Sequence, residues 1–555
     1  MINKIIQILP QYKISSLFKY QGQLLLLNLL DLISVAYLIP IITLILSKEK
    51  FVELLEKYNV GPEWITKTNL IIFLIAFTFF YIIKNSIQIK INKNLLEFLK
   101  TLKSLIAEKR VENFINGDYL YYKEYDRGEL INVVMQATVH FCSKLLYPLM
   151  QLVSELLLLL ILVATSFYIQ WQFMLLLLSV FMIFGISMYL KKRMSIHKIN
   201  EQFFSLHTKV SSIILDILNG VLDIKSSQSE SFFIEGFKTK NKELNQITST
   251  LEATGYNYSK YFEICLVICI TLMGYYFYNN SLGVINLSIL AGIGFKIIPS
   301  LNKILNYLTL IKAHSYSIDI LIKYDREKKE ERITEISFKK EIQLKEISFG
   351  FKKSDAVFNH VNFSIKPTEI IGVKGATGVG KTTLLQIIMG LIDPKLGSRY
   401  VDSKKVDCHF LSFTSYVNQQ PYLFNKTVLE NITMGKENVD YEYLNSLCEK
   451  LELSSTISNL REKYDTQIVQ NDSFFSGGQK QRICIARALY SKPKLLILDE
   501  ATNQQDSVLE NKIFHLIHNL AKQNEMAVIV VSHNKELEKF YDKTYEVKDK
   551  KIVLL

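Results

Sequence analysis

The chain has 555 residues, of which 49% are hydrophobic, and it carries a formal net charge of +12. That length exceeds one ordinary domain. The six cysteines are scattered without a Cys-x-x-Cys pair, so a disulfide framework is not expected. Because the basic residues flank long apolar runs and form no basic face studded with aromatic rings, the charge indicates a membrane protein and not a nucleic-acid-binding one.

Six apolar segments in the first three-fifths of the chain can each cover the hydrocarbon core of a bilayer, which needs roughly 20 helical residues. The predicted spans are 24–46, 70–91, 145–169, 173–190, 262–278 and 284–310. Lysine-rich connections follow the second and fourth spans, and the positive-inside rule places both of them, and both termini, in the cytoplasm. We therefore predict an all-α transmembrane domain over residues 1–324.

Lysines lie inside or beside three of these apolar segments: Lys84, Lys260, Lys296 and Lys303. Ionisable side chains within a membrane span cost free energy, so each is treated as a candidate functional residue. One interpretation is a basic lining that attracts a phosphate-bearing substrate. The other is that the lysines snorkel, or pair with Asp31, Glu155 or Glu263.

Residues 325–340 form a charged linker, and beyond it strand and helix patterns alternate as far as residue 555. The segment Gly375-Ala-Thr-Gly378-Val-Gly380-Lys381-Thr382-Thr383 follows an apolar strand and precedes an apolar helix, which is the context of a phosphate loop. Its backbone N–H groups and the helix N-terminus attract phosphate. Lys381 adds a point charge, and the Thr382 hydroxyl is suited to Mg²⁺. We predict an α/β phosphate-loop domain over 341–555 that binds a nucleotide and Mg²⁺.

Two more apolar strands of this domain end in polar residues. Leu495-Leu-Ile-Leu-Asp499-Glu500 ends in two carboxylates, and Val528-Ile-Val-Val-Ser-His533 ends in a histidine. Asp499 is expected to hold Mg²⁺ through water, and Glu500 to act as the general base toward the attacking water.

The string Phe475-Ser-Gly-Gly-Gln-Lys-Gln-Arg482 resembles the signature of the ABC ATPases, and Tyr416-Val-Asn-Gln419 resembles their Q-loop. The resemblance implies that Gln419 reaches Mg²⁺ and that His533 contacts the γ-phosphate, which with Glu500 completes the catalytic set. It also implies that the signature grips an ATP held by another ATPase domain. The nucleotide-binding residues implied are Phe351, Gly375, Gly378, Gly380, Lys381, Thr382, Thr383, Ser476, Gly477, Gly478, Gln479 and Asp506. In the D-loop, Asn503-Gln504-Gln505 replaces the usual Ser-Ala-Leu before Asp506.

Six spans before one such domain resemble a type IV ABC exporter half-transporter, which implies a homodimer because the chain has one set of motifs. The segment Lys296-Ile-Ile-Pro-Ser-Leu-Asn-Lys303 resembles bacterial lipid-linked oligosaccharide flippases. The resemblance implies ATP-driven movement of an amphipathic, anionic lipid across the bacterial inner membrane, with the ATPase domain in the cytoplasm. The alternatives are an exporter of lipid A, drugs or small peptides. A channel or sensor switched by ATP binding is a further alternative, against which Glu500 and His533 argue.

Overall fold

The computed structural model describes residues 1–46, 49, 51–52, 67–117, 119, 125–169, 195–279, 284–325, 337–351, 356–406, 412–469 and 475–555. The chain divides into two compact units. The first comprises Met1–Gly117 and Tyr121–Lys329, and the second comprises Asp118–Leu120 and Glu330–Leu555.

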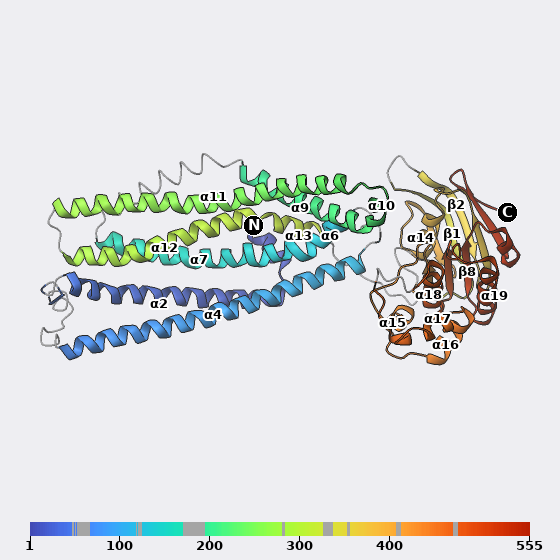
Figure 1. The fold of residues 1–555 in the computed structure, drawn as a ribbon, viewed down its shortest axis with the longest axis horizontal. Coiled ribbons are helices and arrows are strands. Elements are labelled where there is room, and N and C mark those ends of the chain that lie inside the picture. The colour runs from blue at the N-terminus through green and yellow to red at the C-terminus, as the bar shows by residue number, and fades with distance from the viewer. Residues whose placement is uncertain are drawn as a thin grey trace. The chain divides into compact units, whose positions relative to one another are not determined.

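The elements that the structure describes in the first unit are all helices, and the long helices follow from long apolar runs (Figure 1). Its elements are α1 (Ile2–Ile8), η1 (Gln11–Lys13), α2 (Ile14–Leu46), α4 (Lys67–Asn116), α6 (Arg127–Asn132), η3 (Val133–Ala137), η4 (His140–Leu146), α7 (Tyr147–Ile169), α9 (Ser195–Asn219), α10 (Val221–Ser226), α11 (Glu230–Asn279), α12 (Val284–His314) and α13 (Tyr316–Lys323). Helix α12 packs against α2, α7 and α11, so segments far apart in the sequence become neighbours.

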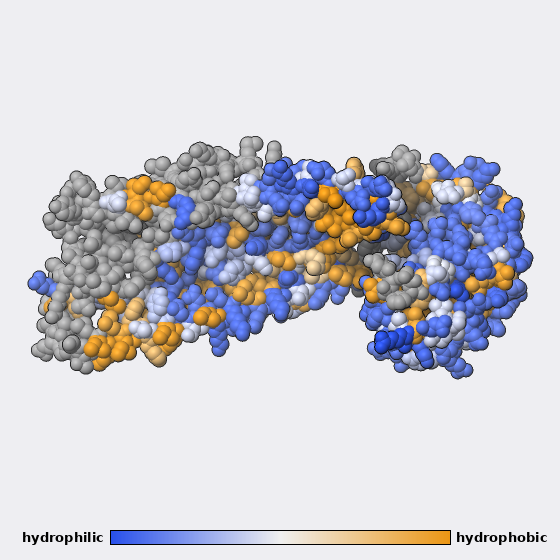
Figure 2. Space-filling view, in the orientation of Figure 1, coloured by the Kyte–Doolittle hydropathy of each residue, from blue (hydrophilic) through white to orange (hydrophobic). Residues whose placement is uncertain are grey.

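Five of the predicted spans fall within described helices. They are 24–46 in α2, 70–91 in α4, 145–169 in η4 and α7, 262–278 in α11 and 284–310 in α12, whereas 173–190 lies outside the described residues. Within the described part of the chain, Ile71–Asn116 and His140–Thr165 are long and apolar enough to cross a membrane. Hydrophobic side chains, among them Ile72 and Phe79, lie exposed along the first part of α4 (Figure 2).

The largest hydrophobic core of the first unit lies where α4, η4 and α13 meet. Leu95 and Leu102 of α4 are fully buried, as are Phe141 of η4 and Leu321 of α13. These four residues lie outside the predicted spans 70–91, 145–169 and 284–310. The helices therefore continue to pack against one another beyond those spans.

The second unit contains two sheets with helices. Its strands are β1 (Ile342–Gly350), β2 (Ala356–Ile365), β3 (Ile370–Lys374), β4 (Leu396–Val401), β5 (Lys404–Lys405), β6 (Thr414–Val417), β7 (Leu495–Asp499), β8 (Ala527–Val531), β9 (Lys543–Lys548) and β10 (Lys551–Leu554). Its helices are α14 (Lys381–Met389), α15 (Val428–Thr433), α16 (Tyr441–Lys450), α17 (Ser454–Ser458), η5 (Lys463–Asp465), α18 (Gly477–Tyr490), α19 (Ser507–Gln523) and η6 (Lys535–Phe540).

The six-stranded sheet positions the polar residues predicted from the sequence. Its strand order is β10-β9-β3-β8-β7-β6, with β3, β8, β7 and β6 parallel. Every residue of β7 and β8 is buried, as expected for parallel strands covered on both faces. Parallel strands end at the same edge of a sheet, so the segments after β3, β6, β7 and β8 gather there. The other sheet is antiparallel, in the order β2-β1-β4-β5.

Candidate functional site

The loop between β3 and α14 is the predicted phosphate loop. Its Gly375 and Gly380 have φ of +148° and +108°, a backbone conformation that residues with a side chain rarely adopt. A Cβ atom added to Gly380 would also lie 2.6 Å from Val357 Cγ1. Lys381 Nζ donates to the carbonyl oxygens of Gly375 at 2.8 Å and Ala376 at 3.1 Å. The Lys381 side chain therefore extends back along the phosphate loop, and its ammonium group lies next to the first residues of that loop.

Asp499, the last residue of β7, joins the phosphate loop to the end of β6. Its Oδ2 accepts from Thr382 Oγ1 at 3.0 Å and from the Tyr416 hydroxyl at 2.9 Å. Burial raises the pKa of the Asp499 carboxyl above its ordinary value and the neighbouring Glu500 charge raises it further, while the hydrogen bonds from Tyr416 and Thr382 act in the opposite direction.

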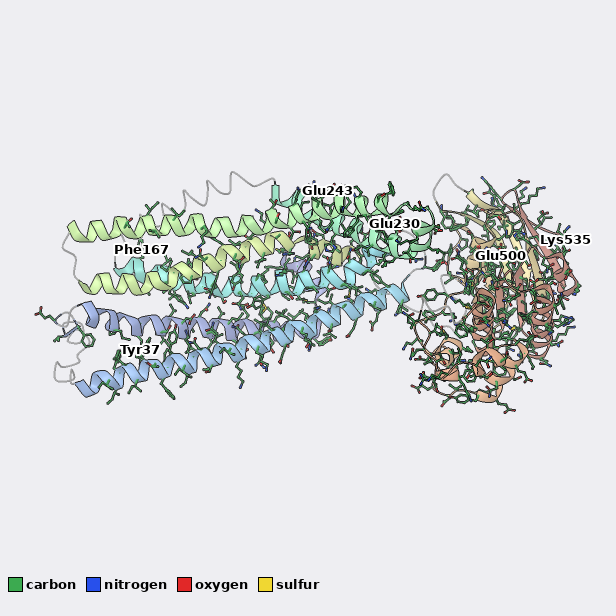
Figure 3. The ribbon with its side chains drawn as sticks, viewed as in Figure 1. Tyr37, Phe167, Glu230, Glu243, Glu500 and Lys535 are labelled. Carbon is green, nitrogen blue, oxygen red and sulfur yellow. The ribbon has the colours of Figure 1, made fainter. Side chains whose placement is uncertain are left out.

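Glu500, labelled in Figure 3, receives contacts from three different loops. Its Oε2 accepts from Gln419 Nε2 at 2.7 Å and from Asn503 Nδ2 at 3.0 Å, and its Oε1 lies 3.4 Å from His533 Nε2. The backbone of Glu500 has φ of +52°, in the left-handed region, and its N–H donates to Val531. Two of the predicted catalytic residues, Gln419 and His533, therefore both contact the third, Glu500.

The signature residues form the start of α18. Ser476 and Gln479 make a capping box, in which Ser476 Oγ accepts from the Gln479 N–H and Gln479 Oε1 accepts from the Ser476 N–H. Gly477 and Gly478 occupy the first helical turn. Asp506 caps α19 by accepting from the Leu509 N–H at 2.8 Å.

The remaining predicted nucleotide-binding residues lie at the edges of this arrangement. Gly378 is in the phosphate loop with φ of +84°, and Thr383 is buried in the first turn of α14. Phe351 directly follows β1, is 51% exposed, and meets Phe349 edge to face at a centroid distance of 5.1 Å.

Some residues at this site were missed at the sequence level. Tyr416 stands in the Q-loop motif, but its bond to Asp499 depends on β6 lying beside β7. Glu510 is buried and accepts from Thr502 at 2.6 Å and from Asn534 at 2.7 Å, which ties the D-loop to the residue after His533. In the sequence, the only indication of a role for these residues was their position, with Tyr416 in the Q-loop motif and Glu510 shortly after the D-loop.

The lysines of the helical unit are paired with carboxylates. Asp31 of α2 accepts from Lys84 of α4 at 2.6 Å and from Lys296 of α12 at 2.5 Å. Glu155 of α7 accepts from Lys303 at 2.7 Å and from Ser300 at 2.7 Å, both on α12. These contacts agree with the pairing interpretation for three of the four lysines. Lys260 of α11 is exposed, and the Glu263 side chain lies outside the described residues.

Two family models match this chain. The ABC transporter transmembrane region matches residues 30–293, and the ABC transporter model matches residues 358–503. The chain belongs to the ABC transporters. The predicted fold class, a helical transmembrane domain followed by an α/β ABC ATPase domain, is thereby confirmed, as is the resemblance to a half-transporter.

Individual relatives agree with this family. An ABC-type transporter of Aureobasidium melanogenum is 35% identical over 200 residues, 35% of this chain and 15% of its own length. An uncharacterized ABC transporter ATP-binding protein of Bacillus subtilis is 36% identical over 214 residues, 38% of this chain and 37% of its own length. The chain therefore spans well under half the length of these two relatives. An ATP-dependent lipid A-core flippase of Saccharophagus degradans is 24% identical over 439 residues, 77% of this chain and 74% of its own length.

The fold also resembles that of a solved ABC transporter. The structure of a bacterial Atm1-family ABC exporter with ATP bound superimposes with a TM-score of 0.81, covering 97% of this chain and 95% of the other at 17% identity. This similarity extends through both units, which places the whole chain in the exporter fold.

Proposed function

We propose that this ABC transporter hydrolyses ATP to move an amphipathic, anionic substrate, a lipid-linked oligosaccharide or a similar phosphate-bearing lipid, across the bacterial inner membrane. The observation that carries the proposal is the charged network inside the apolar helices. Lys84, Lys296 and Lys303 face the two carboxylates of Asp31 and Glu155, so among the described residues the network has one more positive than negative charge. An unbalanced charge in a low-dielectric bundle is costly, and an anionic headgroup would offset it.

The ATPase residues have distinct roles in this proposal. Lys381 and the glycines of its loop bind the β- and γ-phosphates, Gln419 and His533 orient the reacting groups, and Glu500 accepts the proton of the attacking water. The side chains also fit Mg²⁺, because the Thr382 hydroxyl and the Asp499 carboxylate oxygen lie 3.0 Å apart, and Mg²⁺ prefers oxygen ligands. The ion would neutralise charge on the phosphates. Thr382, Asp499 and Gln419 would hold it.

We also propose that two copies of the chain assemble. The chain carries one phosphate loop and one signature, and the signature of this family serves an ATP held by another ATPase domain. A homodimer supplies two equal sites through a closed two-fold arrangement.

Lys296 is the residue on which the substrate proposal is best tested. It shares Asp31 with Lys84, so a Lys296→Gln change removes the surplus charge while leaving Asp31 a cationic partner at 2.6 Å. The assay is ATPase stimulation of the purified full chain by three lipids: a polyprenyl-diphosphate-linked oligosaccharide, lipid A and an uncharged amphiphile. We expect the diphosphate lipid to stimulate turnover, and K296Q to raise its half-maximal concentration about 10-fold or more.

The matched control is Lys323→Gln, which breaks an exposed lysine–glutamate contact with Glu129 on α6, outside the predicted spans. We expect K323Q to respond as the wild type does. Equal stimulation by the uncharged amphiphile, or an unchanged response of K296Q, would contradict the proposal. Stimulation by lipid A alone would favour the cargo named for the Saccharophagus relative.

A further inference from the structure

The D-loop between β7 and α19 has three consecutive amide side chains where the family pattern has serine, alanine and leucine. Two of these amides form hydrogen bonds from their side-chain nitrogens. Asn503 Nδ2 donates to Glu500 Oε2 at 3.0 Å, and Gln505 Nε2 donates to the Gly478 carbonyl at 2.8 Å. Leucine has no polar side-chain atom, so the contact of Gln505 is one that the usual residue could not make, and at position 503 a longer amide donor stands in place of a serine hydroxyl.

Asn503 acts on the side chain proposed as the general base. The same oxygen of Glu500 accepts from both Gln419 and Asn503, while the other oxygen faces His533 at 3.4 Å. Two N–H donors on one carboxylate oxygen restrict rotation of the carboxylate about its last bond. Asn503 therefore helps to determine which Glu500 oxygen is left to face an attacking water.

Gln505 ties the same loop to the signature helix. Besides the Gly478 carbonyl, its amide donates to Gln481 Oε1 at 3.2 Å, and Gln481 also accepts from the Gln504 N–H at 3.3 Å. Gln481 is buried in α18, so this is a fixed attachment point. At its other end the loop is anchored by the bond from Thr502 to buried Glu510.

We propose that Asn503 is a positioning residue that orients the Glu500 carboxylate. Because Gln505 attaches the same loop to the N-terminal end of α18, the position of that helix end affects the orientation of Glu500. The orientation of the base is then linked to the signature within one chain. The inference rests on the ATP hydrolysis proposed above and is independent of the cargo.

The test is steady-state ATPase activity of the purified full chain. A hydrogen bond that aligns the base is needed in the transition state more than in binding, so we expect N503A to lower kcat about 10-fold while KM for ATP stays within about twofold. N503Q keeps an amide donor and should recover kcat to within about threefold of the wild type. Q505A should lower kcat about threefold, and the N503A/Q505A double variant should be no slower than N503A, because both changes interrupt one linkage.

The matched control is N511A, since Asn511 of α19 also donates to a carboxylate, Glu536 at 3.3 Å, but outside the site. It should keep wild-type kcat. If N503A does not fold, as judged by its thermal unfolding and ATP binding, N503L, which also lacks a side-chain donor, provides the same test. A wild-type kcat for N503A, an N503Q variant as slow as N503A, or losses that multiply in the double variant would each overturn the inference. An inactive wild type would instead refute ATP hydrolysis itself.

Discussion

Glu500 combines an unusual backbone with contacts from three loops. A non-glycine residue with φ of +52° costs roughly 1–3 kcal/mol and persists only where its surroundings determine it. Here the surroundings are Gln419, Asn503 and His533. The direction of the carboxylate is thus determined by the protein before any substrate arrives, which is the requirement for a positioned general base.

The Glu500→Gln variant tests that role. Glutamine keeps the size of the side chain but cannot accept the proton, so we expect kcat for ATP hydrolysis to fall by roughly 100-fold or more while ATP binding is retained. Turnover and equilibrium nucleotide binding of the purified full chain measure both parts. E452Q is the control, because Glu452 contacts Lys512 at 2.7 Å on the surface of the same unit. Hydrolysis by E500Q at the wild-type rate would contradict the assignment.

The main residues of this site were predictable for a physical reason. Asp499 ends the apolar strand β7, Glu500 directly follows it, and His533 lies just beyond β8, and the ends of parallel strands meet at one edge. The bonds of Asn503 and Tyr416 were not predictable, because they depend on the rotamers of side chains and on which strands become neighbours.

At the scale of elements, α4 and the segment that follows α13 are joined by a buried ion pair. Arg110 of α4 is fully buried and pairs with Asp325, which also accepts from Asn113 at 3.2 Å. Among the described residues, the Nε and Nη2 atoms of Arg110 have no hydrogen-bond partner. Asp325 is therefore the main compensation for a charge inside the largest core of the helical unit.

Replacing Asp325 with Asn should therefore destabilise this junction. The change leaves the Arg110 charge buried without an anion, which costs about 3–5 kcal/mol. We expect a clearly lower Tm for D325N in thermal unfolding of the detergent-solubilised full chain. The R110M/D325L double variant, which replaces the pair with apolar side chains, should regain most of the loss. K323Q, with its exposed contact, serves as the control, and a wild-type Tm for D325N would refute the role of the pair.

The long helices can be predicted from the apolar runs of the sequence, but the ion-pair partners of the lysines in those helices cannot. Lys84 and Lys296 lie 53 and 265 residues from Asp31, so their shared ion pair arises only when α2, α4 and α12 pack together. The sequence pattern alone therefore left two interpretations open, a substrate-binding lining and internal pairing. In the part of the chain that the structure describes, the network has one lysine more than it has carboxylates, and this difference supports an anionic substrate.

At the scale of the whole molecule, one chain carries one helical unit and one ATPase unit with a single set of motifs. The charged network belongs to the first unit and the candidate hydrolytic site to the second. The proposed function requires that turnover at Glu500 drives movement of a lipid through the helices that bear Lys296. Neither unit alone can perform that function.

The most direct test of this claim is transport by the full chain in sealed lipid vesicles containing a labelled polyprenyl-diphosphate-linked oligosaccharide. Appearance of the glycan on the opposite leaflet after ATP addition is the measured quantity. We predict ATP-dependent transfer by the wild type, loss of transfer with E500Q, and strongly reduced transfer with K296Q, whose basal ATPase activity is retained. Transfer that does not need ATP, or that proceeds equally with K296Q, would contradict the account.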